Sequence, residues 1–559
     1  MPRRARASPA LIIDPAGGPE KCGLAGDGGA LARRTDRLPP ADVDPAVRRI
    51  VRVGVLLGVL GCGGLGHDEG PPQQAGPPDP PEEPSAAVTT APAPPPAPGA
   101  DLSPFEEAVG SRMRAVVEAT VEIERWSGDQ QVAHGSGVLV SAGGDVLTAA
   151  HVVDHPGDRF VVVLPGGGRR DALVTARDGA RDAAMLRAPG PATAFARLAA
   201  HPPKAGDWVV CAGYGGEVPG DRVPMRSAGV VVAPWFAWTV TEYEEGTRYP
   251  KEKKTEIFPG LMRLDCATAS GMSGGPVVDL DGDVVGVVVG SSGVASPIEG
   301  IRHLLPVAAR PRESVAPPAP APAIEAARGP DGIPSRDATL APLLEAPGVE
   351  RSLVELEVAS ARHGGARFAA VLVSPEGLAV APAVPLAGGA HPGETVPVAD
   401  VTVVGHPGAR CTEIVAVRGE LALLRLSGLS LSAPDGPRPV GPAGVAVLGE
   451  IVEAVGAGAV PRSTGFVTGV ERHPGSVEVD PLRWGCGTVR MRHRLANPPV
   501  VVASALAHDT GWSGAGSLLV DRRGRPLALE VANRAPGLGF AVPWPEVLAR
   551  FDAWLPHGR

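Results

Sequence analysis

The strongest constraint on the fold is a series of short apolar segments separated by turns rich in glycine and aspartate. Examples are QVAHGSGVLV (131–140), DVLTA (145–149), FVVVL (160–164), DWVVCAG (207–213) and VVGVVV (284–289). Many short strands with turn signals and almost no helix predict an antiparallel barrel or sandwich. Just upstream, Ser103-Pro104-Phe105-Glu106 is a capping-box pattern with proline at the first helical position, which predicts a short helix to about Arg114.

Length and charge limit the function classes. The chain has 559 residues, too many for one hydrophobic core, so we expect two or more domains. Its formal net charge of −9 is mild for this length, and no basic stripe is visible, so we expect no nucleic-acid partner. Much of the proline lies in two low-complexity blocks, residues 63–104 and 311–350, which read as a tether and a linker.

The six cysteines show no CxxC motif and no Cys/His cluster, so we expect no metal and no cofactor. Four of them divide evenly between the two proposed globular domains, Cys211 with Cys266 and Cys411 with Cys486. One disulfide in each domain and buried free thiols are both compatible with this spacing.

Residues 48–62, RRIVRVGVLLGVLGC, combine an arginine flank with an apolar run too short to span a bilayer. The ending VLGC resembles a bacterial lipobox, which implies a signal peptide over 47–61, lipidation of Cys62 and a flexible tether over 62–104. The alternative is a buried strand with a chance cysteine. We expect residues 1–46 to be a disordered, non-native extension upstream of a natural start near Val47.

Three segments carry the chemistry: GSGVLVSAGGDVLTAAHVV (135–153), ARDGARDAAMLRA (176–188) and LDCATASGMSGGPVVDLDGDVVGV (264–287). Each resembles a trypsin-like serine protease, in particular the HtrA-like bacterial branch. The resemblance implies His151 as general base, Asp182 as triad acid and Ser273 as nucleophile, in the chain order of chymotrypsin.

Some neighbouring residues are alternatives for a triad position or lie near the motifs without matching them. Asp178 is the alternative for the acid, whereas His134 and His155 flank the first motif without matching it and are expected at the surface. The segment 239–257, TVTEYEEGTRYPKEKKTEI, is longer and more charged than the corresponding connection in this family. It is either a solvated hairpin tip or a substrate-gating loop.

The serine, histidine and aspartate of such a triad each have a distinct chemical role. A serine hydroxyl is a weak nucleophile until an imidazole accepts its proton, and a carboxylate holds that imidazole in the right tautomer. The resemblance places the oxyanion hole at the backbone N–H groups of Gly271 and Ser273. It also places Ala267, six residues before the nucleophile, at the base of the primary specificity pocket, which predicts a preference for small or medium apolar side chains.

The pattern returns in the second half of the chain. FAAVLVSPEGLAVAPAV (368–384) parallels the first motif, with Val384 at the position of the catalytic histidine. VRGELALLRL (417–426) parallels the second motif, with Glu420 at the position of the acid. GWSGAGSLLVDRRGRPLAL (511–529) parallels the third and leaves two alternatives, Ser513 as a relic nucleophile or Ala515 at its position.

This half is therefore predicted to be a second copy of the same fold. GLGFAVPWPEVL (537–548) resembles the closing strand and helix entry of HtrA-like domains. His508 follows an apolar strand and is poorly placed to act as a base, so we expect no catalysis here. No PDZ-like glycine-loop signature is visible, which departs from common HtrA-like architecture.

The sequence predicts an all-β chain of two trypsin-like domains, each with two six-stranded antiparallel barrels. Residues 105–310 form the active domain, 311–350 a linker, and 351–559 a degenerate domain with a regulatory or peptide-binding role. The predicted function is a lipid-anchored endopeptidase of the bacterial envelope acting on proteins or peptides, with possible intramolecular regulation by the second domain. The alternatives are a non-catalytic peptide-binding lipoprotein, and an esterase or acyl-transfer activity of the same triad.

Overall fold

A computed structural model gives the structure of this chain. The described residues begin at position 102, so the predicted extension, signal peptide, Cys62 and almost all of the tether lie outside them. They comprise 102–192, 194–215, 224–243, 252–290, 293–306, 321–344, 348–358, 366–383, 386, 397–433, 436–458, 462–470, 477–479, 500–502, 506–511, 516–535 and 537–555.

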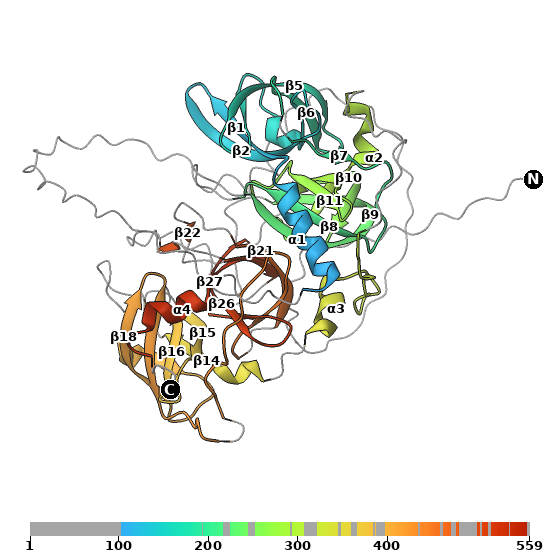
Figure 1. Ribbon diagram of the computed structural model, residues 1–559. Coiled ribbons are helices and arrows are strands. Elements are labelled where there is room, and N and C mark those ends of the chain that lie inside the picture. Colours follow the sequence, from blue (N-terminus) through green and yellow to red (C-terminus); the bar gives the residue numbers. More distant parts are fainter. Residues whose placement is uncertain are drawn as a thin grey trace, which may run out of the picture. The chain divides into compact units, whose positions relative to one another are not determined.

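The first barrel is a closed antiparallel sheet in the order β1-β2-β3-β6-β5-β4 (Figure 1). Its strands are β1 (Thr120–Ser127), β2 (Gln130–Leu139), β3 (Asp145–Thr148), β4 (Arg159–Val163), β5 (Arg169–Asp178) and β6 (Ala183–Arg187). A 3-10 turn, Ala150–Val153, follows β3 directly. Closure of the sheet leaves no exposed edge, and the barrel interior is filled by apolar side chains of alternating strand positions.

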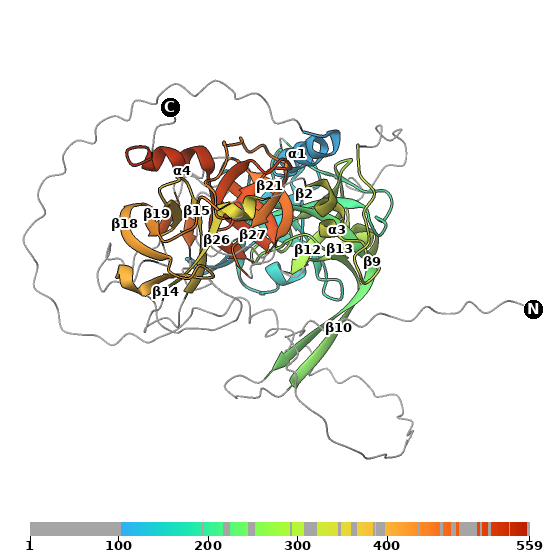
Figure 2. The ribbon, with the colours of Figure 1, turned by 90° about the horizontal axis from the view of Figure 1, so that it is seen from below.

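The second sheet has seven strands in the order β11-β8-β9-β10-β13-β12-β7, and a further β11–β12 pairing closes six of them into a ring. The extra strand β7 pairs in parallel with β12, so this sheet has one strand more than predicted. The strands are β7 (Arg197–Leu198), β8 (Trp208–Gly213), β9 (Met225–Tyr243), β10 (Glu252–Leu264), β11 (Pro276–Asp279), β12 (Asp283–Gly290) and β13 (Val294–Pro297). Figure 2 shows β9 and β10 as a long two-stranded ribbon.

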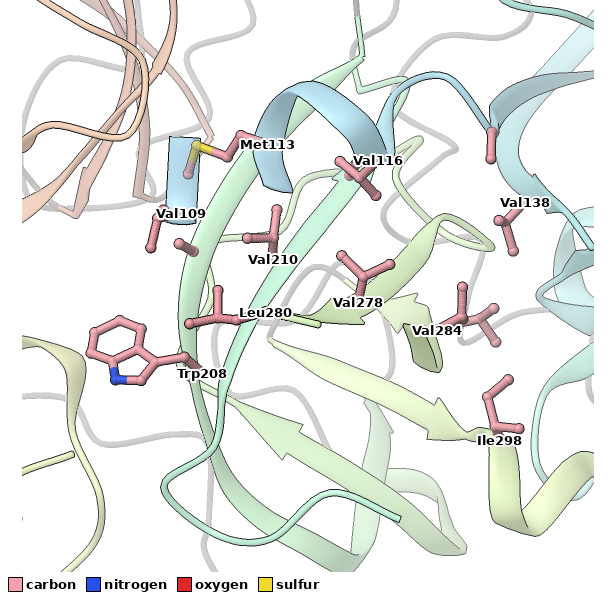
Figure 3. Packing of buried hydrophobic residues seen from close by; sticks show 14 of the residues in the cluster. Val109, Met113, Val116, Val138, Trp208, Val210, Val278, Leu280, Val284 and Ile298 are labelled. Carbon is pink, nitrogen blue, oxygen red and sulfur yellow. The ribbon is translucent and has the colours of Figure 1, made fainter. Parts of the chain in front are cut away.

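Helix α1 (Pro104–Val116) packs on this second sheet. Ser103 caps it with the predicted capping box, in which Glu106 N donates to Ser103 Oγ and Glu106 Oε2 accepts from Ser103 N. The helix buries Phe105, Val109 and Met113 against residues of the sheet, as the close view in Figure 3 shows for the last two. The predicted short helix is confirmed, and it ends two residues later than expected.

The second half repeats both barrels. β14 (Leu353–Val358), β15 (Ala366–Leu372), β16 (Leu378–Pro382), β17 (Val401–Val403), β18 (Arg410–Arg418) and β19 (Leu421–Ser427) close in the order β14-β15-β16-β19-β18-β17. β20 (Ile451–Val455), β21 (Ser463–Gly469), β24 (Leu506–Gly511), β25 (Leu518–Val520), β26 (Pro526–Ala535) and β27 (Gly537–Pro543) close in the order β20-β21-β24-β27-β26-β25. These orders match those of the first half, so the predicted fold class, an all-β chain of tandem trypsin-like barrels, is confirmed.

Short elements complete the described structure. They are α2 (Ile298–Ile301), α3 (Arg336–Leu340), α4 (Trp544–Phe551), the separate pair β22 (Val477–Val479) and β23 (Val500–Val502), and the 3-10 turns Arg302–Leu304, Ala341–Leu343, Val349–Ser352 and Val398–Asp400. In the described part of the chain, no helix has the length and apolar character needed to cross a membrane.

The region expected to be a plain linker packs on the first half. Trp208 Nε1 donates to Ile324 O at 2.8 Å, and Ile324, Ala326 and Leu344 lie against the hydrophobic core of that half. Arg336, at the start of α3, is buried. Proline-rich composition predicted an extended path here, but it carried no sign of these tertiary contacts.

Candidate active site

His151 and Asp182 come from neighbouring strands of the first barrel. His151 lies in the 3-10 turn that follows β3, Asp182 directly precedes β6, and these two strands pair in the sheet. His151 Nδ1 lies 2.6 Å from Asp182 Oδ2, and His151 N donates to Asp182 Oδ1 at 2.8 Å. The carboxylate therefore binds both the ring and the backbone of the histidine and fixes the orientation of the imidazole.

Asp182 has an unusual backbone conformation. Its φ of 48° is the one positive φ of a residue other than glycine in the described ranges. Aspartate tolerates this left-handed region better than most residues because its short polar side chain can bond locally. Strained conformations of this kind concentrate at functional sites, where the surrounding structure enforces them. Here the turn aims the carboxylate at His151.

Two opposing effects act on the protonation of His151. Burial lowers its pKa, whereas the charge and the hydrogen bond of Asp182, with a smaller contribution from Asp154, raise it. The charge effects prevail, and the pKa of His151 lies above its ordinary value. An imidazole made more basic in this way is suited to accept a proton from a nearby hydroxyl.

Ser273 lies in the turn between residue 264 and β11. Ser136 N, on β2, donates to Ser273 O at 2.8 Å and ties this turn to the first barrel. Among the described residues, Ser273 Oγ forms no hydrogen bond with His151. Such contacts are often long in ligand-free enzymes and shorten when substrate binds.

The turn before Ser273 depends on a glycine. Gly271 has a φ of 89°, and a Cβ placed there would lie 2.5 Å from Tyr214 O and 2.8 Å from His134 Cε1. Within the described residues, neither Gly271 N nor Ser273 N donates to another group of the protein. Two unengaged amides flanking the serine hydroxyl match the donors that an oxyanion hole requires.

Ser136 is a residue of this site that the sequence reasoning missed. Its fully buried hydroxyl donates to Gly271 O at 2.7 Å and accepts from Tyr214 N at 2.8 Å. Together with its backbone bond to Ser273 O, it ties the turn that contains Ser273 to β2 and to Tyr214. The glycines on either side of it in the first motif marked a close approach of chains, but nothing in the sequence indicated the partner.

Ala267, predicted to lie at the base of the specificity pocket, is hydrogen-bonded to the second sheet. Ala267 O accepts from Ser227 Oγ at 2.7 Å, and Ala267 packs against a cluster of buried apolar residues. Asp265, two residues earlier, accepts from Val230 N at 2.6 Å and from Arg336 N at 2.6 Å. The nearby carboxylate is therefore committed to structural hydrogen bonds.

Other flanking residues find structural partners. Asp178 accepts from Ala180 N, pairs with Arg181 and lies 3.3 Å from His303 Nε2, so its carboxylate has structural partners. His134 and His155, expected at the surface, are both partly exposed. His134, within β2, has its Nδ1 3.6 Å from Glu122 Oε1, and His155 contacts Arg125.

The thiols of Cys211 and Cys266 are buried and free, as is that of Cys411. The Cys211 side chain forms a hydrogen bond with Cys266, which, with burial, raises the pKa of Cys266 well above its usual range. Cys486 lies outside the described residues. The tip of the charged hairpin, residues 244–251, does so too.

In the second half, the position of the triad acid is occupied by an ion pair. Glu420 directly precedes β19, which has the place of β6 in the repeated barrel order. Glu420 is buried, and Arg550 Nη1 from α4 donates to its Oε1 at 2.8 Å. Val384, at the histidine position, lies outside the described residues.

The turn that contains Ser273 has a counterpart in the second half. Gly274 and Gly516 both have a positive φ, 87° and 80°, and a Cβ on either would collide with a carbonyl oxygen of the equivalent strand, Ser136 O or Ala369 O. Each glycine also donates its amide to the second strand after it, β12 or β26. Gly516 is therefore the counterpart of Gly274.

This correspondence bears on the two alternatives for the nucleophile position. Ser273 directly precedes Gly274, and Ala515 directly precedes Gly516. Counting back from the paired glycines favours Ala515, not Ser513, as the counterpart of the nucleophile. Both residues themselves lie outside the described ranges. His508, expected after a strand, instead lies within β24 and is almost fully buried, because the closed barrel of this half includes that segment.

Comparisons with known proteins agree with this geometry. Residues 135–287 match the family model described as trypsin-like peptidase domain. Over 179 residues the chain is 30% identical to the probable periplasmic serine endoprotease DegP-like of Brucella suis biovar 1, which covers 31% of this chain and 30% of the relative. Over 191 residues it is 31% identical to the mitochondrial serine protease HTRA2 of Bos taurus, which covers 31% of this chain and 36% of the relative.

Among solved structures, the serine endoprotease from Yersinia pestis aligns with a TM-score of 0.27 and 20% sequence identity, over 35% of this chain and 64% of that chain. The chain thus spans 30% and 36% of the length of the two curated relatives named above. The matched region contains all three predicted triad positions. Residues 135–287 therefore match a trypsin-like peptidase domain, and the chain is similar over this region to serine proteases named DegP-like and HTRA2.

Proposed function

We propose that this chain is a serine endopeptidase whose one working site is His151, Asp182 and Ser273. The observation that carries the proposal is the two-point hold of Asp182 on His151, at 2.6 Å to the ring and 2.8 Å to the backbone. A carboxylate that orients an imidazole beside a serine turn supports nucleophilic catalysis.

In the proposed mechanism, Ser273 Oγ attacks the carbonyl carbon of the scissile bond while His151 Nε2 accepts the hydroxyl proton. The tetrahedral oxyanion receives hydrogen bonds from the N–H groups of Gly271 and Ser273. The C–N bond then breaks, and His151 returns the proton to the leaving amine. A water molecule, activated by the same imidazole, hydrolyses the acyl-enzyme and regenerates Ser273.

Substrates are proposed to be proteins or peptides with a small or medium apolar side chain at the primary pocket. Support comes from Ala267 at the expected base of that pocket and from the commitment of Asp265 to Val230 and Arg336. An unpaired carboxylate in the pocket would favour basic side chains instead.

The proposed location is the bacterial cell envelope, with anchoring through a lipid on Cys62. Support comes from the lipobox-like segment ending at Cys62 and from relatives named as periplasmic endoproteases. The second half is proposed to be non-catalytic and regulatory or peptide-binding, because Glu420 is engaged by Arg550 and Ala515 aligns with the nucleophile.

The test is covalent labelling of the purified chain, from residue 63 onward, with a fluorophosphonate probe. We expect labelling of the wild type, loss of labelling in Ser273→Ala, and unchanged labelling in the matched control Ser513→Ala. Loss of labelling in Ser513→Ala would contradict the assignment to the first half. An unlabelled, folded wild type would contradict the endopeptidase and favour a peptide-binding protein.

A further inference from the structure

The two halves of the chain share one hydrophobic core. Phe105 and Trp208 from the first half cluster with Leu448, Ile451 and Phe466 from the second. The rings of Phe105 and Trp208 are 4.9 Å apart, and Phe466 lies 5.9 Å from Trp208 and 6.2 Å from Phe105, all in edge-to-face geometry. Such packing matches the interior of a domain and not a transient contact between domains.

Buried polar groups also cross the boundary. Asp509 of the second half is fully buried, and its Oδ2 accepts from Ala228 N of the first half at 2.8 Å while its Oδ1 accepts from Phe466 N at 2.7 Å. Arg336 Nη1 donates to Ala228 O at 3.0 Å and lies 3.4 Å from Asp509 Oδ2. A buried carboxylate with these partners specifies one docking geometry, since any shift would leave charged groups without partners.

One side chain of the second half enters the core of the first. Leu538, on β27, is buried in the cluster that contains Cys266, Ala269 and Met272 of the catalytic turn region. It also lines a small cavity together with Met225 of β9. Met225 packs against the same cluster, so Leu538 and Met225 belong to one continuous region of packing next to the turn that contains Ser273.

Met225 also lies close to the turn that contains Ser273. A Cβ on Gly215 would overlap the Met225 sulfur and would lie 3.4 Å from Ala269 Cβ and 3.5 Å from Ser270 O. Gly215 therefore lies close to both Met225 and the turn, with no room for a side chain. Gly271 follows Ser270 in that turn and also lies close to Gly215. A Cβ placed on Gly271 would be 3.3 Å from Gly215 Cα.

We propose that the second half is a built-in positioning element for the oxyanion turn and acts through Leu538, Met225 and Gly215. The partner that this surface of the first half fits is the last barrel of the same chain. The inference rests on the proposed function for its effect on activity, but the contacts themselves can be tested without any activity. Leu538 is a positioning residue and touches no substrate.

The test compares Leu538→Ala with Leu527→Ala in the full chain. Leu527 is equally buried, on the neighbouring strand β26, but its cluster contains only residues of the second half. Both changes remove the same atoms from a buried site and are expected to lower stability by similar amounts. Hydrogen exchange of peptides covering 264–280, the rate of fluorophosphonate labelling, and kcat and KM on a peptide substrate are measured for each variant.

We expect Leu538→Ala to speed hydrogen exchange in the 264–280 peptides at least ten-fold and to slow fluorophosphonate labelling about ten-fold. On the peptide substrate, we expect it to lower kcat more than it raises KM. The amides of Met272 and Gly275 report this because each is hydrogen-bonded within the turn, and the amide of Gly274 reports it through its hydrogen bond from the turn to Val288 O on β12. Leu527→Ala should change both by less than two-fold, and Leu538→Met, which conserves volume, should restore both.

Equal effects of Leu538→Ala and Leu527→Ala on exchange in 264–280 would overturn the inference, as would unchanged exchange in Leu538→Ala. If the wild type is not labelled at all, the endopeptidase fails, but the exchange data still decide whether the second half positions the turn. The two proposals therefore fail separately.

Discussion

At the scale of single residues, the site depends on side chains that organise it without performing chemistry. Ser136 donates to Gly271 O and accepts from Tyr214 N, and its own amide donates to Ser273 O. These bonds fix the peptide planes of the turn that carries the proposed oxyanion donors. Since donors must lie within tenths of an ångström of the developing charge, a loosened turn should slow the chemical step more than it weakens substrate binding.

Ser136→Ala is therefore expected to lower kcat at least ten-fold while KM changes little. The change leaves a buried N–H and a buried C=O without partners, a penalty of about 1–3 kcal/mol for such a group. The matched control is Ser141→Ala, because Ser141 is also buried, and its hydroxyl also donates one hydrogen bond and accepts another, in this case with Asp145 alone. Similar losses of kcat in the two variants would contradict the positioning role of Ser136.

At the scale of elements, the turn before the fourth strand in the barrel order places an acidic side chain in both halves, but the acid binds a different partner in each. The turn before β6 presents Asp182 to His151, whereas the equivalent turn before β19 presents Glu420 to Arg550 of the terminal helix α4. The acid of the second half is buried and fixes a helix to a barrel. Removal of the arginine would leave a carboxylate without its counter-charge in a place that water reaches poorly.

We expect Arg550→Ala to lower the free energy of unfolding by about 3 kcal/mol, the lower end of values for breaking a buried ion pair. The matched control is Arg425→Ala in the same barrel, whose pair with Glu413 is about half-exposed on both sides. An exposed pair of this kind contributes about 0–1 kcal/mol. Urea unfolding measures both variants, and equal losses would show that Glu420 does not depend on Arg550.

At the scale of the whole molecule, buried acidic side chains lie beside the hydrophobic core that the two halves share. The segments Ala97–Phe236 and Pro259–Arg559 form one compact unit. Glu106 of α1 accepts from Ile451 N at 2.9 Å, and Glu450, the residue before it, accepts from Val447 N at 3.0 Å. Burial, with the charges of Asp521 and Glu106 and against that of Arg525, raises the pKa of Glu450 to about 7.

The raised pKa of Glu450 predicts a pH-dependent stability. Between pH 4.5 and about 7, the folded chain keeps a proton on Glu450 that the unfolded chain has released. Stability therefore falls as pH rises through this window, by at most about 1.4 kcal/mol for each pH unit from one group. Glu450→Gln, which is neutral throughout, should flatten the slope and exceed the wild type in stability at pH 8.

Urea unfolding at a series of pH values measures this slope. Part of it should remain in Glu450→Gln, because burial also raises the pKa of Asp279 and of Asp509 to about 6. Glu413→Gln, a change at an exposed carboxylate, is the control and should leave the slope unaltered. A slope in Glu450→Gln as steep as that of the wild type would contradict the prediction.

Local sequence determined the strands, the helix cap and the two copies of the barrel order, because period-2 apolar segments and turn residues act within a few positions. The pairing of His151 with Asp182 was predicted from the resemblance of their motifs to trypsin-like proteases, and the structure brings the two side chains together. The glycines of the third motif indicated a tight turn, and Gly271 and Gly274 occupy it with positive φ.

Only the tertiary structure decided which surfaces close on one another. Contacts between distant segments determine the role of Ser136, the packing of 321–344 on the first half and the entry of Leu538 into the other half. Sequence patterns report whether a side chain is buried, because burial follows the periodicity of one element. They do not report what buries it, because the partner is selected by shape and charge across the folded chain.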